Sequence, residues 1–220
     1  QLKIDDGLIV WAGSSDDTTG GRWRIFYYDM RAAIPTVVMP SGQTNLDHWM
    51  PSVNNRLIAW QGSDSGSDVE IFYCDLQSNP SAAVQLTFNA SDDRHPQVHN
   101  RIIAWDGMQS GYDPTIFFID LNAEAPTQIP LVTDHHSYDR LSHVRDGIIV
   151  WTATSASPIS QVFSYNLNEV SPTIKQLTLN TEIDEASYSP RIYQGKMAWY
   201  TVDGSETAIF SYNVDTELYT

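Results

Sequence analysis

One short motif occurs five times in the chain, and its regular spacing is the strongest constraint on the fold. Each copy is an apolar segment that ends in tryptophan: GLIVW at Trp11, RLIAW at Trp60, RIIAW at Trp105, GIIVW at Trp151 and GKMAW at Trp199. Successive tryptophans are 49, 45, 46 and 48 residues apart. The chain is therefore built from five copies of one structural unit.

A second motif follows each tryptophan at a nearly constant distance. Its copies are RIFYYDM from Arg24, EIFYCDL from Glu70, TIFFIDL from Thr115, QVFSYNL from Gln161 and AIFSYNV from Ala208. Periods of about 40 to 50 residues with several short strands are typical of β-propellers. The sequence therefore predicts an all-β fold, a five-bladed β-propeller in a single domain. The blades are expected near residues 1–40, 41–88, 89–132, 133–179 and 180–220.

Each unit is predicted to hold four antiparallel strands. Turn signals at Asn54-Asn55, His99-Asn100, Asp146-Gly147 and Gln194-Gly195 separate an inner strand from the tryptophan strand. Pro130 lies in the segment after the third aromatic strand, and a residue without an N–H is tolerated only at a sheet edge. The fourth strand is therefore the outer edge. The middle strands are apolar at consecutive positions, which indicates that both faces are covered and that the tryptophans pack between blades.

Composition limits the partners and the compartment. The chain has 12 Lys and Arg against 27 Asp and Glu, a net charge of −15 that repels nucleic acid and anionic lipid. No apolar run approaches the roughly 20 residues of a membrane helix, so membrane insertion is not expected. The low lysine count and the tracts rich in Ser, Thr, Asp and Gly favour a periplasmic, cell-surface or extracellular protein. Cys74 lies in an apolar run and is predicted to be a small buried side chain.

The third unit resembles the TolB-type β-propeller repeat of bacterial periplasmic and archaeal surface proteins. The matching residues are Pro96, Ile103, Ala104, Trp105, Gly111, Asp113, Ile116, Asp120 and Leu121. The second unit matches through Gly66, Asp68, Ile71, Asp75, Leu76, Leu86 and Thr87. The resemblance covers essentially the whole chain and implies the propeller fold. It implies no single activity, because propellers of this type serve as scaffolds, peptidase gates, lyases and surface modules.

Candidate binding residues lie where the chain enters the inner strands, because these entries point at the axis of a propeller. They are His48, Trp49, Asp93, Arg94, His95, Tyr138, Asp139, Arg140 and Tyr188. The central cavity of the ring is the default binding site of this fold. The Asp93-Arg94 and Asp139-Arg140 pairs also have a structural interpretation, in which they hydrogen-bond loop backbone across blades.

Two functions remain open at this point. The first is an exported, non-enzymatic binding or assembly scaffold that engages a protein or a glycan with its loop-rich central face. The alternative is a carbohydrate-active enzyme, a lyase or a glycosidase, with an axial His/Asp site. No cofactor is predicted, although His48, Asp93, His95 and Asp139 carry groups that suit a divalent metal.

Overall fold

The structure is a computed structural model that describes residues 2–14, 22–41, 46–63, 68–77, 82–109, 113–131, 140–154, 159–180 and 185–219. The chain forms two compact units, Gln1–Gly107 and Met108–Thr220. The organisation as a single domain therefore stays a prediction. Within the described ranges, no helix is long and apolar enough to cross a membrane.

Twenty strands form five antiparallel sheets, and each sheet consists of four consecutive strands. Blade 1 contains β1 (Leu2–Asp5), β2 (Leu8–Ser14), β3 (Trp23–Asp29) and β4 (Val37–Val38). Blade 2 contains β5 (His48–Asn54), β6 (Leu57–Ser63), β7 (Val69–Asp75) and β8 (Val84–Gln85). Blade 3 contains β9 (Arg94–His99), β10 (Ile102–Gln109), β11 (Asp113–Asp120) and β12 (Ile129–Leu131).

Blade 4 contains β13 (Arg140–Arg145), β14 (Ile148–Thr154), β15 (Ser160–Asn166) and β16 (Ile174–Gln176). Blade 5 contains β17 (Glu185–Tyr193), β18 (Lys196–Asp203), β19 (Glu206–Asn213) and β20 (Leu218–Tyr219). The fourth strand lies at the edge of every sheet, as the sequence predicts. The all-β prediction with four antiparallel strands per blade is confirmed.

Two-residue turns join the first strand of each blade to the second. Both turn residues have positive φ, the geometry that matches the twist of paired strands. The turns are Asp6-Gly7, Asn55-Arg56, Asn100-Arg101, Asp146-Gly147 and Gln194-Gly195. The sequence-based turns in blades 2 and 3 were wrong by one residue, because Asn54 and His99 are the last residues of β5 and β9. The Asn54 side chain instead accepts the N–H of Asn100 at 2.8 Å.

The first strand of several blades has a bulge at the same place. The register shifts between Trp49 and Ser52 in blade 2 and between Tyr188 and Arg191 in blade 5. Blade 3 has the corresponding shift in its pairing of β9 with β10. Met50, His95 and Ser189 have φ of 56°, 53° and 49°, and each precedes a proline. A bulge bends the strand and redirects its side chains, so these positions are where inner-strand residues can leave the regular sheet.

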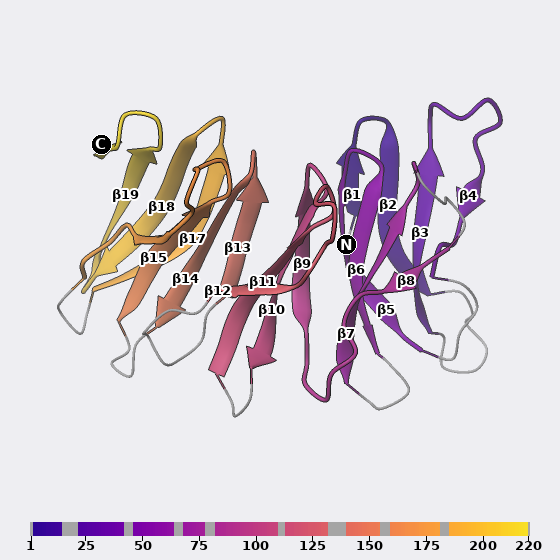
Figure 1. The fold of residues 1–220 in the computed structure, drawn as a ribbon, viewed down its shortest axis with the longest axis horizontal. Helices are drawn as coiled ribbons and strands as arrows, with labels where there is room; N and C mark the ends of the chain where they lie inside the picture. The colour runs from indigo at the N-terminus through magenta and orange to yellow at the C-terminus, as the bar shows by residue number, and fades with distance from the viewer. Residues whose placement is uncertain are drawn as a thin grey trace. The chain divides into compact units, whose positions relative to one another are not determined.

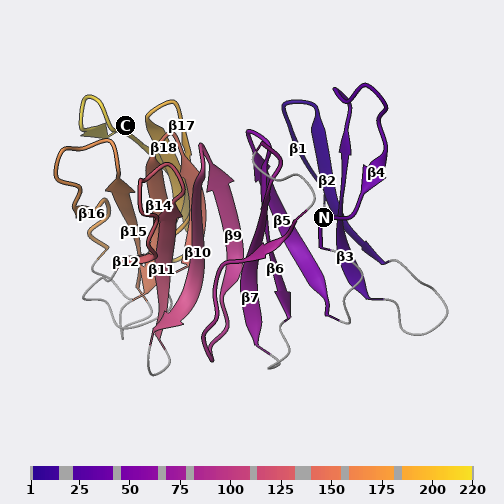
Figure 2. The ribbon, with the colours of Figure 1, turned by 45° about the vertical axis from the view of Figure 1, so that its right-hand side comes forward.

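The tryptophans of the repeat lie in the core. Trp60, Trp105, Trp151 and Trp199 are buried, which confirms that they are packing residues. Within the first unit, Trp60 packs with Val10, Ile25 and Tyr27 of the neighbouring sheet, and Figure 1 shows blades 1 and 2 face to face. Within the second unit, Trp199 packs against Val150 and Val162. Figure 2 shows the strands of blades 1 and 2 as two neighbouring layers toward the right of the view. Trp11 is only partly buried and stacks on Phe26.

A hydroxyl after the outer strand is bonded to the third strand. Thr87 Oγ1 accepts the N–H of Ile71 at 2.9 Å, and Thr178 Oγ1 accepts that of Val162 at 2.9 Å. Ser41 Oγ does the same for Ile25 at 3.1 Å. The recurring hydroxyl thus ties the chain beyond a short edge strand back to its blade.

Candidate functional site

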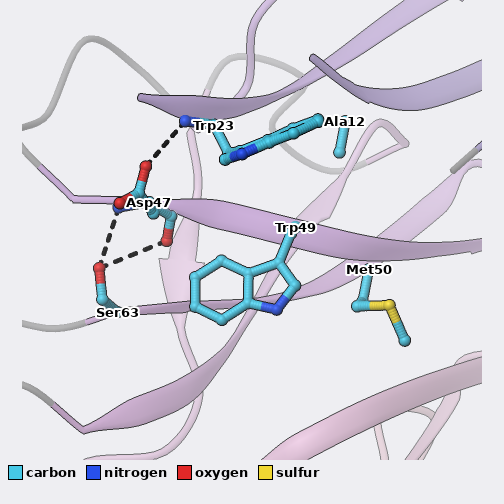
Figure 3. Close-up of a pocket in the computed structure, with 6 residues that line it drawn as sticks. All are labelled: Ala12, Trp23, Asp47, Trp49, Met50 and Ser63. Carbon is cyan, nitrogen blue, oxygen red and sulfur yellow. Dashed lines mark hydrogen bonds between the residues drawn. The ribbon is translucent and has the colours of Figure 1, made fainter. Parts of the chain in front are cut away.

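A pocket lies in the first unit at the end of the sheets where β3 and β5 begin and β6 ends (Figure 3). It has a volume of about 520 Å³ and is lined by Ala12, Trp23, Asp47, Trp49, Met50 and Ser63. Trp23 is 50% exposed, and Trp49 is half-buried. The volume falls in the range of about 300 to 1,000 Å³ that is common for ligand sites. The pocket therefore offers two aromatic surfaces to a ligand.

The polar atoms of this pocket are bonded to one another. Asp47 Oδ1 accepts the N–H of Trp23 at 2.8 Å, and Asp47 Oδ2 accepts Arg22 at 3.0 Å. The Asp47 N–H donates to Ser63 Oγ at 2.9 Å, as the dashed lines in Figure 3 show. Burial alone would raise the pKa of Asp47, but the bonds from Trp23 and Arg22 outweigh it and hold that pKa below its ordinary value. Asp47 thus fixes the positions of Arg22, Trp23 and Ser63 through hydrogen bonds. These bonded groups form the polar rim of the pocket.

The same positions between blades 2 and 3 carry different residues. Gln61 occupies the place of Ala12, and its Oε1 accepts the N–H of His95 at 2.7 Å. Asp92 occupies the place of Asp47 and accepts the N–H of Val69 at 2.9 Å, as Asp47 does for Trp23. The hydrogen-bonded carboxylate is thus repeated at these two junctions. Of the two, the junction of blades 1 and 2 has the apolar lining of Ala12 and Trp23.

His48 is held inside blade 2 rather than presented to solvent. It is 2% exposed, and its Nδ1 accepts the indole N–H of Trp60 at 3.0 Å. Burial and the nearby Arg24 lower the pKa of His48 to about 4, so the imidazole is neutral. The ring also meets Phe72 edge to face at 5.0 Å between centroids. The structure therefore gives His48 a packing and acceptor role.

Asp93 has the equivalent role in blade 3. It is 2% exposed, and its Oδ1 accepts the indole N–H of Trp105 at 3.0 Å. Asn89 donates to the other carboxylate oxygen at 2.7 Å. Burial raises the pKa of Asp93, although these hydrogen bonds oppose the shift. His48 and Asp93 thus satisfy buried tryptophans at the same relative position in two blades.

The other predicted site residues are not gathered at one point among the residues that the structure describes. Arg94 is paired with Asp92 at 2.6 Å. The side chain of His95 is 43% exposed, and its Nδ1 lies 2.8 Å from Asp106 Oδ2. Tyr188 is 39% exposed and lies 5.4 Å from Tyr200 between ring centroids. Tyr138 and Asp139 lie outside the described residues, and Arg140 is described only as the first residue of β13.

The chemistry of the cysteine and of metal ligands can be stated for the described part of the chain. Cys74 is buried, as predicted, and burial together with Asp75 raises the pKa of its thiol to about 11. Among the described residues, no three His, Cys, Asp or Glu side chains come close enough to hold a metal ion. The metal hypothesis for His48, Asp93, His95 and Asp139 therefore gains no support from the described side chains.

Sequence reasoning placed Trp49 in the site but missed Trp23, Asp47 and Ala12. An alignment of the five units contains a signal for two of them. Ala12 is the smallest residue that directly follows a repeat tryptophan, since the others are Gln61, Asp106, Thr152 and Tyr200. Trp23 occupies the position of Val69 in the next blade. The residues that break the repeat, rather than those that maintain it, mark the pocket.

Comparisons with known proteins give the fold. No family model matches the chain, and no curated protein matches it. TolB from Acinetobacter baumannii has a similar structure, with a TM-score of 0.55 and 15% identity over 97% of this chain and 50% of that chain. The chain thus spans about half the length of that TolB.

Two further solved structures are similar. Prolyl oligopeptidase B from Galerina marginata gives a TM-score of 0.66 and 8% identity over 96% of this chain and 33% of that chain. A chain of the nidogen/laminin complex gives a TM-score of 0.52 and 11% identity, covering 98% and 74% of the two chains. At these identities the similarity shows the fold alone, and the chain has a TolB-like, five-bladed β-propeller fold.

Proposed function

We propose that the chain is an exported, non-enzymatic binding or assembly module that engages a protein or a glycan. The pocket of Trp23 and Trp49 is the observation that carries this proposal. Its aromatic surfaces are partly exposed, while the carboxylate of Asp47 is already bonded to Trp23 and Arg22. Such a site gains affinity by removing apolar surface from water.

The position of the pocket within its blades supports the proposal. Trp49 follows the first residue of β5, so the pocket lies where the chain enters an inner strand. The net charge of −15 favours a cationic partner over nucleic acid. Export rests on the composition of the chain, which has few lysines and many Ser, Thr, Asp and Gly residues.

The alternative, a carbohydrate-active enzyme with an axial His/Asp site, has weaker support. A general acid or base must reach the reacting group, whereas His48 and Asp93 are buried and accept indole N–H groups. Of the predicted axial residues, His95 is the exposed histidine, and it is bonded to Asp106. A hydrolytic mechanism would need the His95–Asp106 pair as its acid or base.

Binding to arrays tests the proposal. The labelled protein and its Ala12→Gln variant are applied in parallel to peptide and glycan arrays. The substitution gives blade 1 the residue that blade 2 carries at the same position. We expect binding that Ala12→Gln weakens about tenfold or more, with the bound ligand recovered at unchanged mass. Binding that is insensitive to both Ala12→Gln and Trp49→Arg, or cleavage of the ligand, would refute it.

A further inference from the structure

At the junction of blades 2 and 3, a side chain of the protein occupies a place that is open at the junction of blades 1 and 2. Between blades 2 and 3, the buried amide of Gln61 reaches the N–H of His95 at 2.7 Å. Between blades 1 and 2, Ala12 stands at the position of Gln61, because each residue directly follows the tryptophan of its blade. Alanine has no side-chain acceptor and is much shorter than glutamine. The open volume therefore includes the place that a glutamine side chain takes at the next junction.

The backbone donor at the open junction has the same local geometry as its occupied counterpart. Met50 and His95 have φ of 56° and 53°, and both precede proline in the bulge of an inner strand. Met50 also lines the pocket. Because the bulges match, we expect the Met50 N–H to be directed as the His95 N–H is. A carbonyl oxygen from a ligand would then take the place of Gln61 Oε1.

We infer that this pocket binds a basic peptide segment, which packs an apolar side chain against Trp23 and Trp49 and places a carbonyl oxygen on the Met50 N–H. This inference rests on the proposed binding function. It names a peptide because the matching junction already binds an amide carbonyl, a group that every peptide carries. The polar rim of Asp47 and Ser63 is satisfied internally, which suits an apolar side chain better than a sugar with many hydroxyls.

The net charge of the protein indicates which residues should flank the apolar side chain of the peptide. The whole chain carries 27 acidic and 12 basic residues, and this overall charge would attract Lys or Arg flanking the apolar side chain. At the pocket itself Asp47 lies beside Arg22 and Arg24, so the attraction comes from the wider surface. Such attraction between exposed charges is screened by salt, with a Debye length of about 10 Å at 0.1 M. Affinity should therefore fall as the ionic strength rises, while the preference for an apolar side chain should remain.

Blocked peptides test this inference directly. The probes are acetyl-Lys-Lys-Xaa-Lys-Lys-amide with Leu, Phe, Pro or Ser at Xaa, titrated to millimolar concentration while the indole N–H resonances of Trp23 and Trp49 are followed by NMR. We expect the Leu, Phe or Pro peptide to shift both resonances and to bind about tenfold or more tightly than the Ser peptide. Ala12→Gln should abolish the shifts. Thr152→Gln, the same change in blade 4, should leave them intact.

The outcomes separate this inference from the proposed function. Shifts that persist in Ala12→Gln would overturn the assignment to this pocket. If no peptide shifts Trp23 or Trp49, but an arrayed glycan binds and Ala12→Gln abolishes its binding, the peptide is overturned and the binding function stands. If neither class binds in an Ala12-dependent way, both fail.

Discussion

Gly62 is the position at which adding one methyl group should be most damaging to blade 2. A Cβ at Gly62 would lie 2.3 Å from His48 Nδ1, 2.9 Å from His48 Cε1 and 3.0 Å from the carbonyl oxygen of Asp47. His48 is a buried ring that packs against both Trp60 and Phe72, so it cannot move aside freely. Gly62→Ala must therefore displace the imidazole that accepts the indole N–H of Trp60.

Two costs add up in this variant. A buried donor that loses its acceptor costs about 1 to 3 kcal/mol, and the indole of Trp60 is fully buried. Forcing a methyl group into a packed core costs about 1 to 3 kcal/mol more. We therefore expect Gly62→Ala to lower the free energy of unfolding by about 2 to 6 kcal/mol. For a chain of this length, each kcal/mol corresponds to about 2 to 4 °C in Tm.

Gly13 supplies a matched control, because it lies two residues after Trp11 just as Gly62 lies two residues after Trp60. A Cβ at Gly13 would meet Phe26 and Trp11 at 3.5 Å, which is ordinary contact. Urea unfolding of both variants, with the indole N–H of Trp60 followed by NMR, measures the difference. If Gly13→Ala and Gly62→Ala agree within about 0.5 kcal/mol, the proposed role of His48 is wrong.

Three further predictions concern the buried titratable groups. The pKa of His48 is lowered from 6.5 to about 4, so its contribution to stability is present above pH 6.5 and is lost as the pH falls toward 4. Urea denaturation across this pH range should show the free energy of unfolding falling by about 3 kcal/mol, and His48→Gln should remove this dependence on pH. Asp93→Ala should lower the free energy of unfolding in urea by about 1 to 3 kcal/mol, because the indole N–H of Trp105 loses its acceptor. Asp93→Asn retains a carbonyl acceptor, so its free energy of unfolding should fall by less. Equal losses in the two variants would argue against the indole contact. Cys74, with its pKa raised to about 11 and its side chain buried, should resist iodoacetamide at pH 8 and react only after unfolding, as mass spectrometry would show.

The fold was predictable because the same pattern of apolar strands occurs in all five repeats. Apolar runs such as that ending at Trp60 need cover on both faces, and positive-φ turns such as Asp146-Gly147 fix the hairpins. The turn at Asn55-Arg56 was misplaced because arginine gives no signal for positive φ. There the pairing of the strands, rather than residue preference, sets the backbone conformation.

The site was harder to predict, because the same residue types serve structure and function. His48 and Asp93 looked like ligands at the propeller axis, yet each bonds a tryptophan that lies 12 residues later. That common spacing was present in the sequence, but only the side-chain positions show its meaning. The pocket depends on the short side chain of Ala12, and that residue stands out only when the five units are aligned on their tryptophans.

The outermost strands also bear on how the protein avoids aggregation. β4, β8 and β20 contain two residues each, and β12 contains Pro130, which has no N–H to offer. A long unpaired edge is a template for strand addition by another chain, and short or proline-containing edges suppress it. The outer edges formed by β4, β8, β12 and β20 are therefore poor templates for the addition of a strand from another chain.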